Sequence, residues 1–122
     1  MRRQMTTIGP RVLDNYDFLR CIAKSKSERK RLKYIKNATR DQLLSLVEVA
    51  ANILSPNFSI TKRHKDRLIP HANYIRRLSR VRSERGARIL TQRGNGPIFA
   101  SLLIPIISEI GRLLLTRNNN NG

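Results

Sequence analysis

The sequence contains one cysteine, no tryptophan and only eight acidic residues among its 122 positions. The single thiol of Cys21 cannot form an intramolecular disulfide, and the sequence around it has no feature typical of a thiol nucleophile. His64 and His71 are seven residues apart, which separates them by two helical turns and is too far for a shared metal ion. Glycine-rich phosphate loops and paired-carboxylate motifs are missing as well. We therefore expect no enzyme activity, no metal and no cofactor.

Because acids are few, the charge is one-sided: 25 Lys and Arg face eight Asp and Glu, which gives a formal net charge of +17. A compact protein with this charge repels itself, so a polyanion is expected to relieve the repulsion. Nucleic acid is the leading candidate and an anionic membrane is the second. The segment from Gln4 to Pro10 is not the apolar stretch of a secretory signal, so a nuclear or cytoplasmic protein is expected rather than a secreted one.

Apolar residues recur every three or four positions through most of the chain, which predicts an all-α fold. We expect a small basic bundle of four to five short helices over 11–93, preceded by a flexible N-terminus over 1–10. A glycine-rich junction at 94–97 then leads to a separate apolar helix over 98–116 and to a disordered tail over 117–122.

Several residues predict where these helices begin and end. Ser27 is a predicted N-cap, and Thr39 with Gln42 has the spacing of a capping box. Thr61 is placed to cap a further helix, in which Pro70 predicts either a kink or two short helices meeting at that point. The helical patterns before the junction run over 12–23, 24–36, 43–54, 61–79 and about 81–92.

The positive charge is concentrated before the junction. The chain up to residue 95 has 23 Lys and Arg and seven acids, whereas the rest has two bases and one acid. Eight of the bases lie over 20–36 and eleven over 62–93, so two clusters flank the apolar helix at 43–54. Two basic faces on one small core suit contact with more than one stretch of duplex. The residues expected to bind DNA are Arg29, Lys30, Arg31, Lys33, Lys62, Arg63, Arg76, Arg77, Arg80, Arg82, Arg85 and Arg88.

Recognition of a particular base sequence is not expected. The three tyrosines and three phenylalanines are scattered, and no zinc-finger, homeodomain or basic-zipper spacing is present. Without aromatic residues between the basic ones, stacking on single strands is a weaker interpretation than binding to duplex. The sequence thus favours electrostatic binding of double-stranded DNA.

The apolar segment over 98–115 leaves three interpretations open. Its charge-free part, 98–108, has 11 residues and is too short to span a bilayer. It can pack against the rest of the domain or a second copy, lie in a membrane interface, or be a tail that processing removes.

One segment resembles a known family. Gly94-Asn-Gly-Pro-Ile-Phe-Ala-Ser-Leu-Leu-Ile-Pro-Ile-Ile-Ser-Glu-Ile-Gly111 resembles the C-terminal part of the adenovirus core protein X precursor (the mu peptide precursor) and of similar basic core proteins of Polinton or Maverick elements and adintoviruses. The resemblance implies a DNA-condensing basic part and an apolar part that a viral protease removes. Gln92-Arg93-Gly94-Asn95 followed by Gly96 is similar to that protease's pattern, which implies cleavage between Asn95 and Gly96.

Together, these features predict a virion core protein of a virus or transposon that binds and condenses double-stranded DNA without strong sequence preference. The virion interior and the host nucleus are the expected locations, with other capsid or core proteins as further partners. Two alternatives remain. One is a membrane-active protein of the capsid interior that contacts membrane transiently through 98–115, and the other is an RNA-binding protein.

Overall fold

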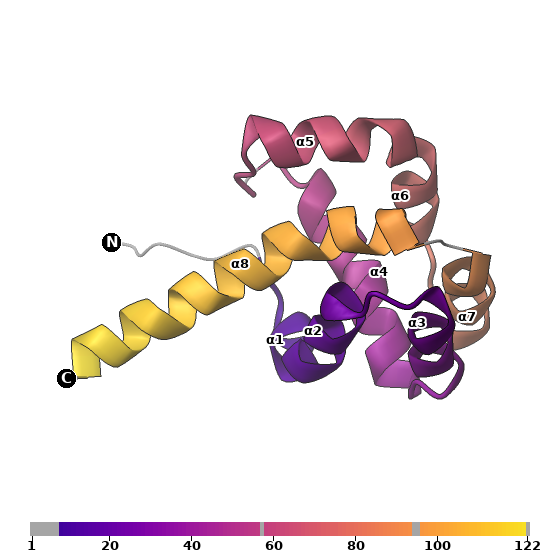
Figure 1. The fold of residues 1–122 in the computed structure, drawn as a ribbon, viewed down its shortest axis with the longest axis horizontal. Helices are drawn as coiled ribbons and strands as arrows, with labels where there is room; N and C mark the ends of the chain where they lie inside the picture. The colour runs from indigo at the N-terminus through magenta and orange to yellow at the C-terminus, as the bar shows by residue number, and fades with distance from the viewer. Residues whose placement is uncertain (1–7, 57, 94–95, 122) are drawn as a thin grey trace.

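A computed structural model describes the backbone of residues 8–56, 58–93 and 96–121, and the side chains of these ranges except for 96–97 and 113–121. The fold is all-α, as predicted, and the described residues contain no strand. In chain order the helices are α1 (Pro10–Asp14), α2 (Tyr16–Lys24), α3 (Glu28–Lys36), α4 (Arg40–Leu54), α5 (Lys62–Leu68), the 3-10 turn η1 (Ile69–His71), α6 (Ala72–Ser79), α7 (Glu84–Arg93) and α8 (Gly96–Asn121) (Figure 1).

The three predicted N-caps are confirmed, although α3 and α7 begin at Glu28 and Glu84, a few residues after the predicted starts at 24 and about 81. The side chain of Ser27 accepts a hydrogen bond of 3.2 Å from the amide of Lys30 at the start of α3. At the start of α4 the capping box is complete, because Thr39 Oγ1 accepts from the amide of Gln42 and Gln42 Oε1 accepts from the amide of Thr39. Thr61 caps α5 in the same way. Each cap satisfies a backbone N–H that has no partner within its own helix.

Two helical stretches are divided in the structure. The first stretch, predicted over 12–23, divides into α1 and α2 at Asn15. The side-chain amide of Asn15 donates to the carbonyl of Arg11 and to Asp41 Oδ2, both at 2.8 Å. Such local bonds compete with a continuous helix. The second stretch, predicted over 61–79, divides at Pro70, where η1 joins α5 to α6. Of the two outcomes predicted there, a kink or two short helices, the structure shows two short helices. The bundle before residue 94 therefore contains α1 to α7 rather than four to five helices.

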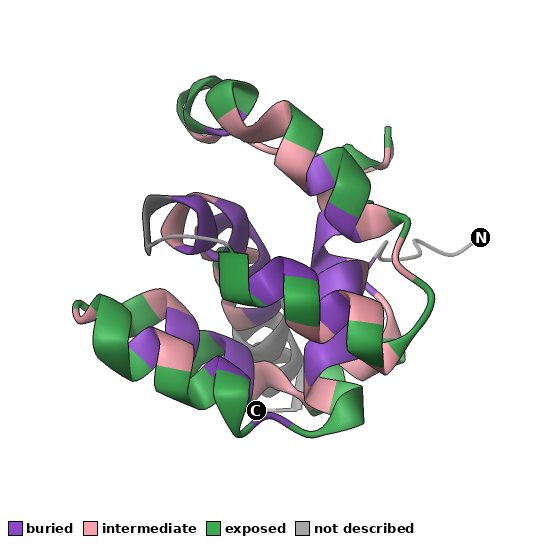
Figure 2. Ribbon diagram, turned by 90° about the vertical axis from the view of Figure 1, so that its right-hand side faces the viewer, coloured by how far each residue is buried: buried purple, intermediate pink, exposed green. Residues whose placement is uncertain are grey.

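Helix α4 lies at the centre of the core. It packs against α1, α6, α7 and α8, and seven of its residues are buried. Buried positions lie on the inward faces of the helices and exposed positions on the outward faces (Figure 2). Ile8 is also buried in this core, which corrects the expectation that the whole of 1–10 is flexible; residues 1–7 lie outside the described ranges.

The apolar helix is part of the same core, which corrects the expectation of a separate element. Helix α8 packs against α2, α4 and α5. Its fully buried side chains belong to one cluster with those of the other helices, and they are Phe99, Leu102, Leu103, Ile106 and Ile110. The backbone of α8 continues to Asn121, where a disordered tail was expected over 117–122; Gly122 lies outside the described residues.

Candidate nucleic-acid interface

Helix α3 presents a buried inward face and a basic outward face. Arg31 and Ile35 point inward and are buried. Arg29, Lys33 and Lys36 are spaced four and three residues apart, so they lie on one outward face. All three are exposed and, with Leu32 and Asn37, they line one shallow hollow. We call Arg29, Lys33 and Lys36 the α3 stripe.

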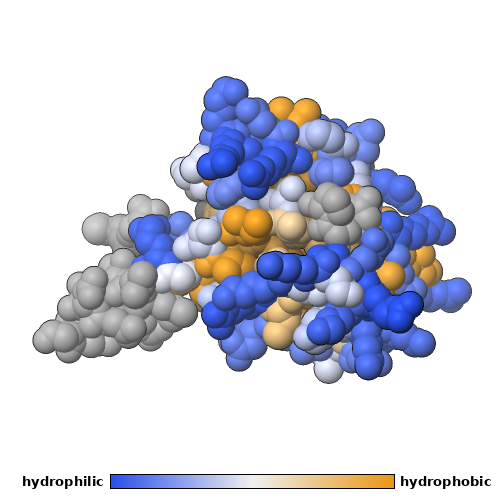
Figure 3. Space-filling model, viewed as in Figure 1, coloured by the Kyte–Doolittle hydropathy of each residue, from blue (hydrophilic) through white to orange (hydrophobic). Residues whose placement is uncertain are grey.

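A second exposed group of cations belongs to α5. Arg63, Lys65 and Arg67 are exposed, and we call these three residues the α5 surface. Helix α5 lies across the molecule from α3, with α4 and α8 between them (Figure 1). The space-filling view agrees, because hydrophilic side chains cover the α5 end and the α2–α3 end, with an apolar band over α8 between them (Figure 3).

The carboxylates neutralise few of the cations. Among the described residues, the ion pairs involve only Arg11, Lys62, Arg88 and Arg112. Arg11 pairs with both Asp41 and Glu48, and Lys62 pairs with Asp66 at 3.0 Å. The exposed cations without an ion pair to a described acid are Arg20, Lys24, Lys26, Arg29, Lys30, Lys33, Lys36, Arg40, Arg63, Lys65, Arg67, Arg76, Arg77, Arg80, Arg82, Arg85 and Arg93.

Most of the DNA-binding residues predicted from the sequence are exposed. On α3 these are Arg29, Lys30 and Lys33, and at α5 they are Lys62 and Arg63. Along α6, the following turn and α7, the exposed residues are Arg76, Arg77, Arg80, Arg82 and Arg85; Arg76 also donates to Asn73 Oδ1 at 3.2 Å.

Arg31 has a structural place instead. Its side chain is only 6% exposed and donates to the carbonyl oxygens of Ile22 and Ser25 at the end of α2. The last carbonyls of a helix have no partners within the helix and carry partial negative charge, so they accept a buried guanidinium well. Arg31 therefore presents almost no surface to a ligand, and we leave it out of the candidate interface.

Arg88 plays the same part at the end of α3. Its guanidinium donates to the carbonyls of Ile35, Lys36 and Ala38 at 3.3, 2.9 and 3.0 Å, and it pairs with Glu84 at 3.1 Å. These bonds fasten α7 to α3 and occupy the side chain. We leave Arg88 out of the candidate interface as well.

A tyrosine binds a backbone carbonyl near the end of α7. The hydroxyl of Tyr74, on α6, donates to the carbonyl of Leu90 at 2.9 Å. Burial raises the pKa of Tyr74 to about 12, because the charged phenolate is poorly solvated there. The neutral form that donates this hydrogen bond is therefore kept well above physiological pH.

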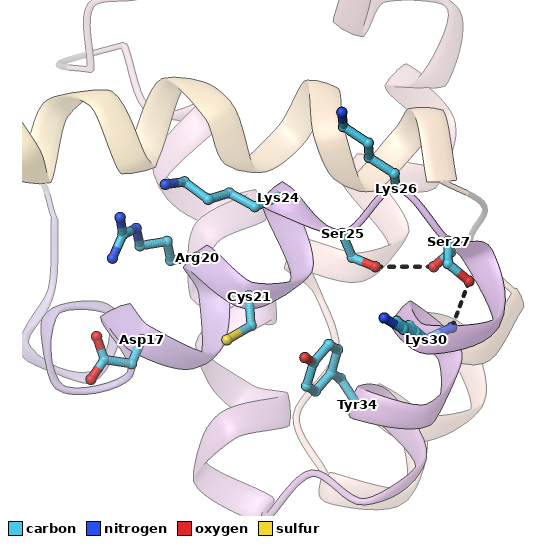
Figure 4. A pocket seen from close by; sticks show the side chains of 9 residues that line it. All are labelled: Asp17, Arg20, Cys21, Lys24, Ser25, Lys26, Ser27, Lys30 and Tyr34. Atoms are coloured by element: carbon cyan, nitrogen blue, oxygen red, sulfur yellow. Dashed lines mark hydrogen bonds between the residues drawn. The ribbon is translucent and has the colours of Figure 1, made fainter.

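The structure also brings Lys30 together with residues that the sequence reasoning passed over. Arg20 and Lys24 on α2, Lys26 in the turn, and Lys30 and Tyr34 on α3 line one hollow, with Asp17, Cys21, Ser25 and Ser27 completing its wall (Figure 4). The four-residue spacings of Arg20 with Lys24 and of Lys30 with Tyr34 placed each pair on one helix face. Only the fold, in which Arg31 of α3 binds carbonyls at the end of α2, brings the two pairs to one hollow.

The predicted cleavage junction is only partly visible. Gln92 is exposed near the end of α7, and Gly96 is the first residue of α8. Gly94 and Asn95 lie outside the described residues. No group of three His, Cys, Asp or Glu side chains in the described part of the chain could hold a metal ion. Within that part, no single helix is long and apolar enough to cross a membrane. Helices α7 and α8 reach the required length and apolar composition only when taken together, and they are bent by 115° relative to each other.

Fold and surface together define a small all-α protein with basic surfaces at two ends of one core. Comparisons with models of protein families, with curated proteins and with solved structures found no match to this chain.

Proposed function

We propose that this protein binds double-stranded DNA without strong sequence preference and condenses it by bridging neighbouring duplexes. The observation that carries the proposal is the set of exposed cations that no described acid neutralises, among them the α3 stripe and the α5 surface. Phosphate contacts of this kind supply affinity but carry no sequence information. The arrangement supports bridging, since the α3 stripe and the α5 surface lie apart, with α4 and α8 between them (Figures 1 and 3).

Binding is tested by fluorescence anisotropy with duplexes of unrelated sequence over a range of salt concentrations. Affinity is expected to be similar for all sequences and to fall by about three to five orders of magnitude between 50 and 200 mM salt, if about 6 to 10 phosphates are neutralised. Affinity that survives high salt, or that depends strongly on sequence, would contradict the electrostatic proposal.

Bridging is tested with two matched variants that each remove three charges. One carries Arg29→Gln, Lys33→Gln and Lys36→Gln on the α3 stripe. The other carries substitutions to Gln at all three residues of the α5 surface, Arg63, Lys65 and Arg67. Energy transfer between donor- and acceptor-labelled duplexes reports whether one protein brings two duplexes together.

The unchanged protein is expected to give energy transfer, and each variant is expected to bind a duplex but to lose most of the transfer. If all three residues contact phosphate, the slope of log affinity against log salt becomes shallower by about 2.7, at about 0.9 per phosphate contact. If one variant abolishes binding and the other changes neither binding nor transfer, one surface alone binds DNA and bridging is refuted.

We further propose that the setting is the core of a virus-like particle, in the virion interior and the host nucleus. Support comes from the resemblance of residues 94–111 to the adenovirus core protein X precursor and its relatives, together with the basic character of the domain before them. Mass spectrometry of assembled particles tests this. We expect the chain to be present, and a fragment ending at Asn95 would establish processing at the junction. Absence of the chain from particles would overturn the viral setting while leaving DNA binding to be judged by its own assay.

A further inference from the structure

The hollow between α2 and α3 combines several cations with an exposed aromatic ring. It has a volume of about 580 Å³, within the range of about 300–1,000 Å³ that small-ligand sites occupy. Four cations, Arg20, Lys24, Lys26 and Lys30, line it against one acid, Asp17. None of the four forms an ion pair with a described acid. The hollow is therefore a cationic site of suitable size for an anion with an organic group attached.

An exposed aromatic ring lines the same hollow. Tyr34 is 41% exposed, and its ring rises from α3 toward α2, on the side of Cys21 (Figure 4). Charge neutralisation alone gives no reason for an exposed aromatic ring among lysines and arginines. Stacking a nucleobase on the ring does give one, because every base has a π-face and such stacking tolerates any sequence.

We propose that this hollow holds an unpaired nucleotide, with its base against Tyr34 and its phosphate beside Lys30, while Arg20 and Lys24 on α2 add positive charge at the opposite wall (Figure 4). A base inside a duplex has both faces covered by its neighbours, so a single tyrosine gains stacking energy only from a base that is unstacked, as at a strand end, a gap or a single-stranded stretch. This inference rests on the proposed function and adds a second kind of partner to it: the α3 stripe and the α5 surface meet duplex, and the hollow between α2 and α3 takes unpaired nucleotides.

The test compares binding of the full chain to three probes: a blunt duplex, the same duplex with a single-stranded extension, and the same duplex with a ribonucleotide extension. We expect an extension to raise affinity about 5- to 150-fold over the blunt duplex. Tyr34→Ala should remove this preference, and Tyr34→Phe should keep it because the ring remains. Lys33→Gln, on the α3 stripe, is the matched control and should weaken binding to all three probes equally.

The two extensions separate the possible sources of the nucleotide. A preference for both supports recognition of base and phosphate alone, and a preference for only one supports the hollow and identifies DNA or RNA as its source. If the unchanged protein does not distinguish extended from blunt probes, or if Tyr34→Ala weakens all probes alike, the inference is overturned while duplex binding stands. Failure to bind the blunt duplex at low salt would instead overturn the proposed function.

Cys21 provides a second readout inside the hollow. It is exposed, it lines the hollow, and it is the only cysteine in the sequence, so a neutral maleimide labels one site per chain. A saturating extended probe is expected to slow this labelling, and the blunt duplex should leave it nearly unchanged. Equal protection by both probes would show that duplex itself covers the hollow, which contradicts the inference.

Discussion

Removing α8 should unfold the domain rather than release a dispensable tail. The resemblance to viral core precursors implies that the apolar segment is cut away at Asn95–Gly96, and the sequence alone is compatible with a tail that stands apart. In the structure, however, α8 packs against α2, α4 and α5 and contributes to the single core. We therefore predict that a chain ending at residue 95 does not form this bundle.

The magnitude follows from the side chains that would be lost. Phe99, Leu102, Leu103 and Ile106 have no exposed surface, and Ile110 is 1% exposed. Burial of each such side chain stabilises by about 1.5–3 kcal/mol, so the five together contribute about 7.5–15 kcal/mol. That equals the entire free energy of unfolding of a typical domain, about 5–15 kcal/mol.

Circular dichroism and urea denaturation of residues 1–95 test the prediction. We expect no cooperative unfolding transition from this fragment, and recovery of the transition when a peptide of residues 96–122 is added. Leu103→Ala in the full chain should cost about 2–5 kcal/mol, whereas Ser108→Ala, at an exposed position of α8, should change stability by less than about 0.5 kcal/mol. A cooperative transition of residues 1–95 with the stability of the full chain would refute the reasoning.

Three further predictions concern single residues. Arg31→Met should lower the free energy of unfolding by about 1.5–3 kcal/mol for each charge-assisted bond lost, yet leave the DNA affinity of the folded protein unchanged; reduced affinity at unchanged stability would instead place Arg31 in the interface. The pKa of Tyr74 is raised from 10.0 to about 12, so the stability that burial of its neutral form provides is complete below pH 10 and is lost as pH rises to 12. Alkaline denaturation should reveal this loss, and Tyr74→Phe should lack it. A methyl group at Gly111 would meet no atom within 4 Å, so Gly111→Ala should raise the free energy of unfolding by about 0.5–1 kcal/mol; a lower melting temperature would contradict this.

The helix starts could be predicted because their causes are local. Ser27, Thr39 and Thr61 each satisfy an amide three residues ahead, and the spacing alone reveals the bond. The break at Pro70 could be predicted for the same reason, because a proline disrupts the turn of helix in which it lies. Asn15 was missed because one of its two partners is Asp41, which lies 26 residues away in the sequence.

The helix ends and the place of α8 depend on contacts between distant residues. Arg88 binds carbonyls about 50 residues earlier in the chain. Within α7 the sequence shows only that Arg88 lies four residues after Glu84, with which it pairs, and nothing local points to the carbonyls of α3. Arg31 is likewise one base in a run of bases until the fold places it over the end of α2. The apolar pattern of α8 indicates that another surface covers the helix, but it does not indicate that this surface is formed by α2, α4 and α5. Counting basic residues in the sequence therefore gives too large a set of candidate DNA-binding residues, because Arg31 and Arg88 bind helix ends instead.

The net positive charge should make the stability of the fold depend on bound DNA, and the dependence of the melting temperature on salt tests this. A net charge of +17 destabilises the compact state through self-repulsion, which salt screens because the Debye length falls from about 10 Å at 0.1 M to about 3 Å at 1 M. The melting temperature of the free protein should therefore rise with salt. Duplex DNA stabilises the folded state according to its affinity, and that affinity falls with salt. The melting temperature of the complex should thus fall with salt until the two curves meet. Two results would contradict this: salt could lower the melting temperature of the free protein, or the complex could melt no higher than the free protein at low salt. Either would show that the exposed cations are balanced within the fold rather than by DNA.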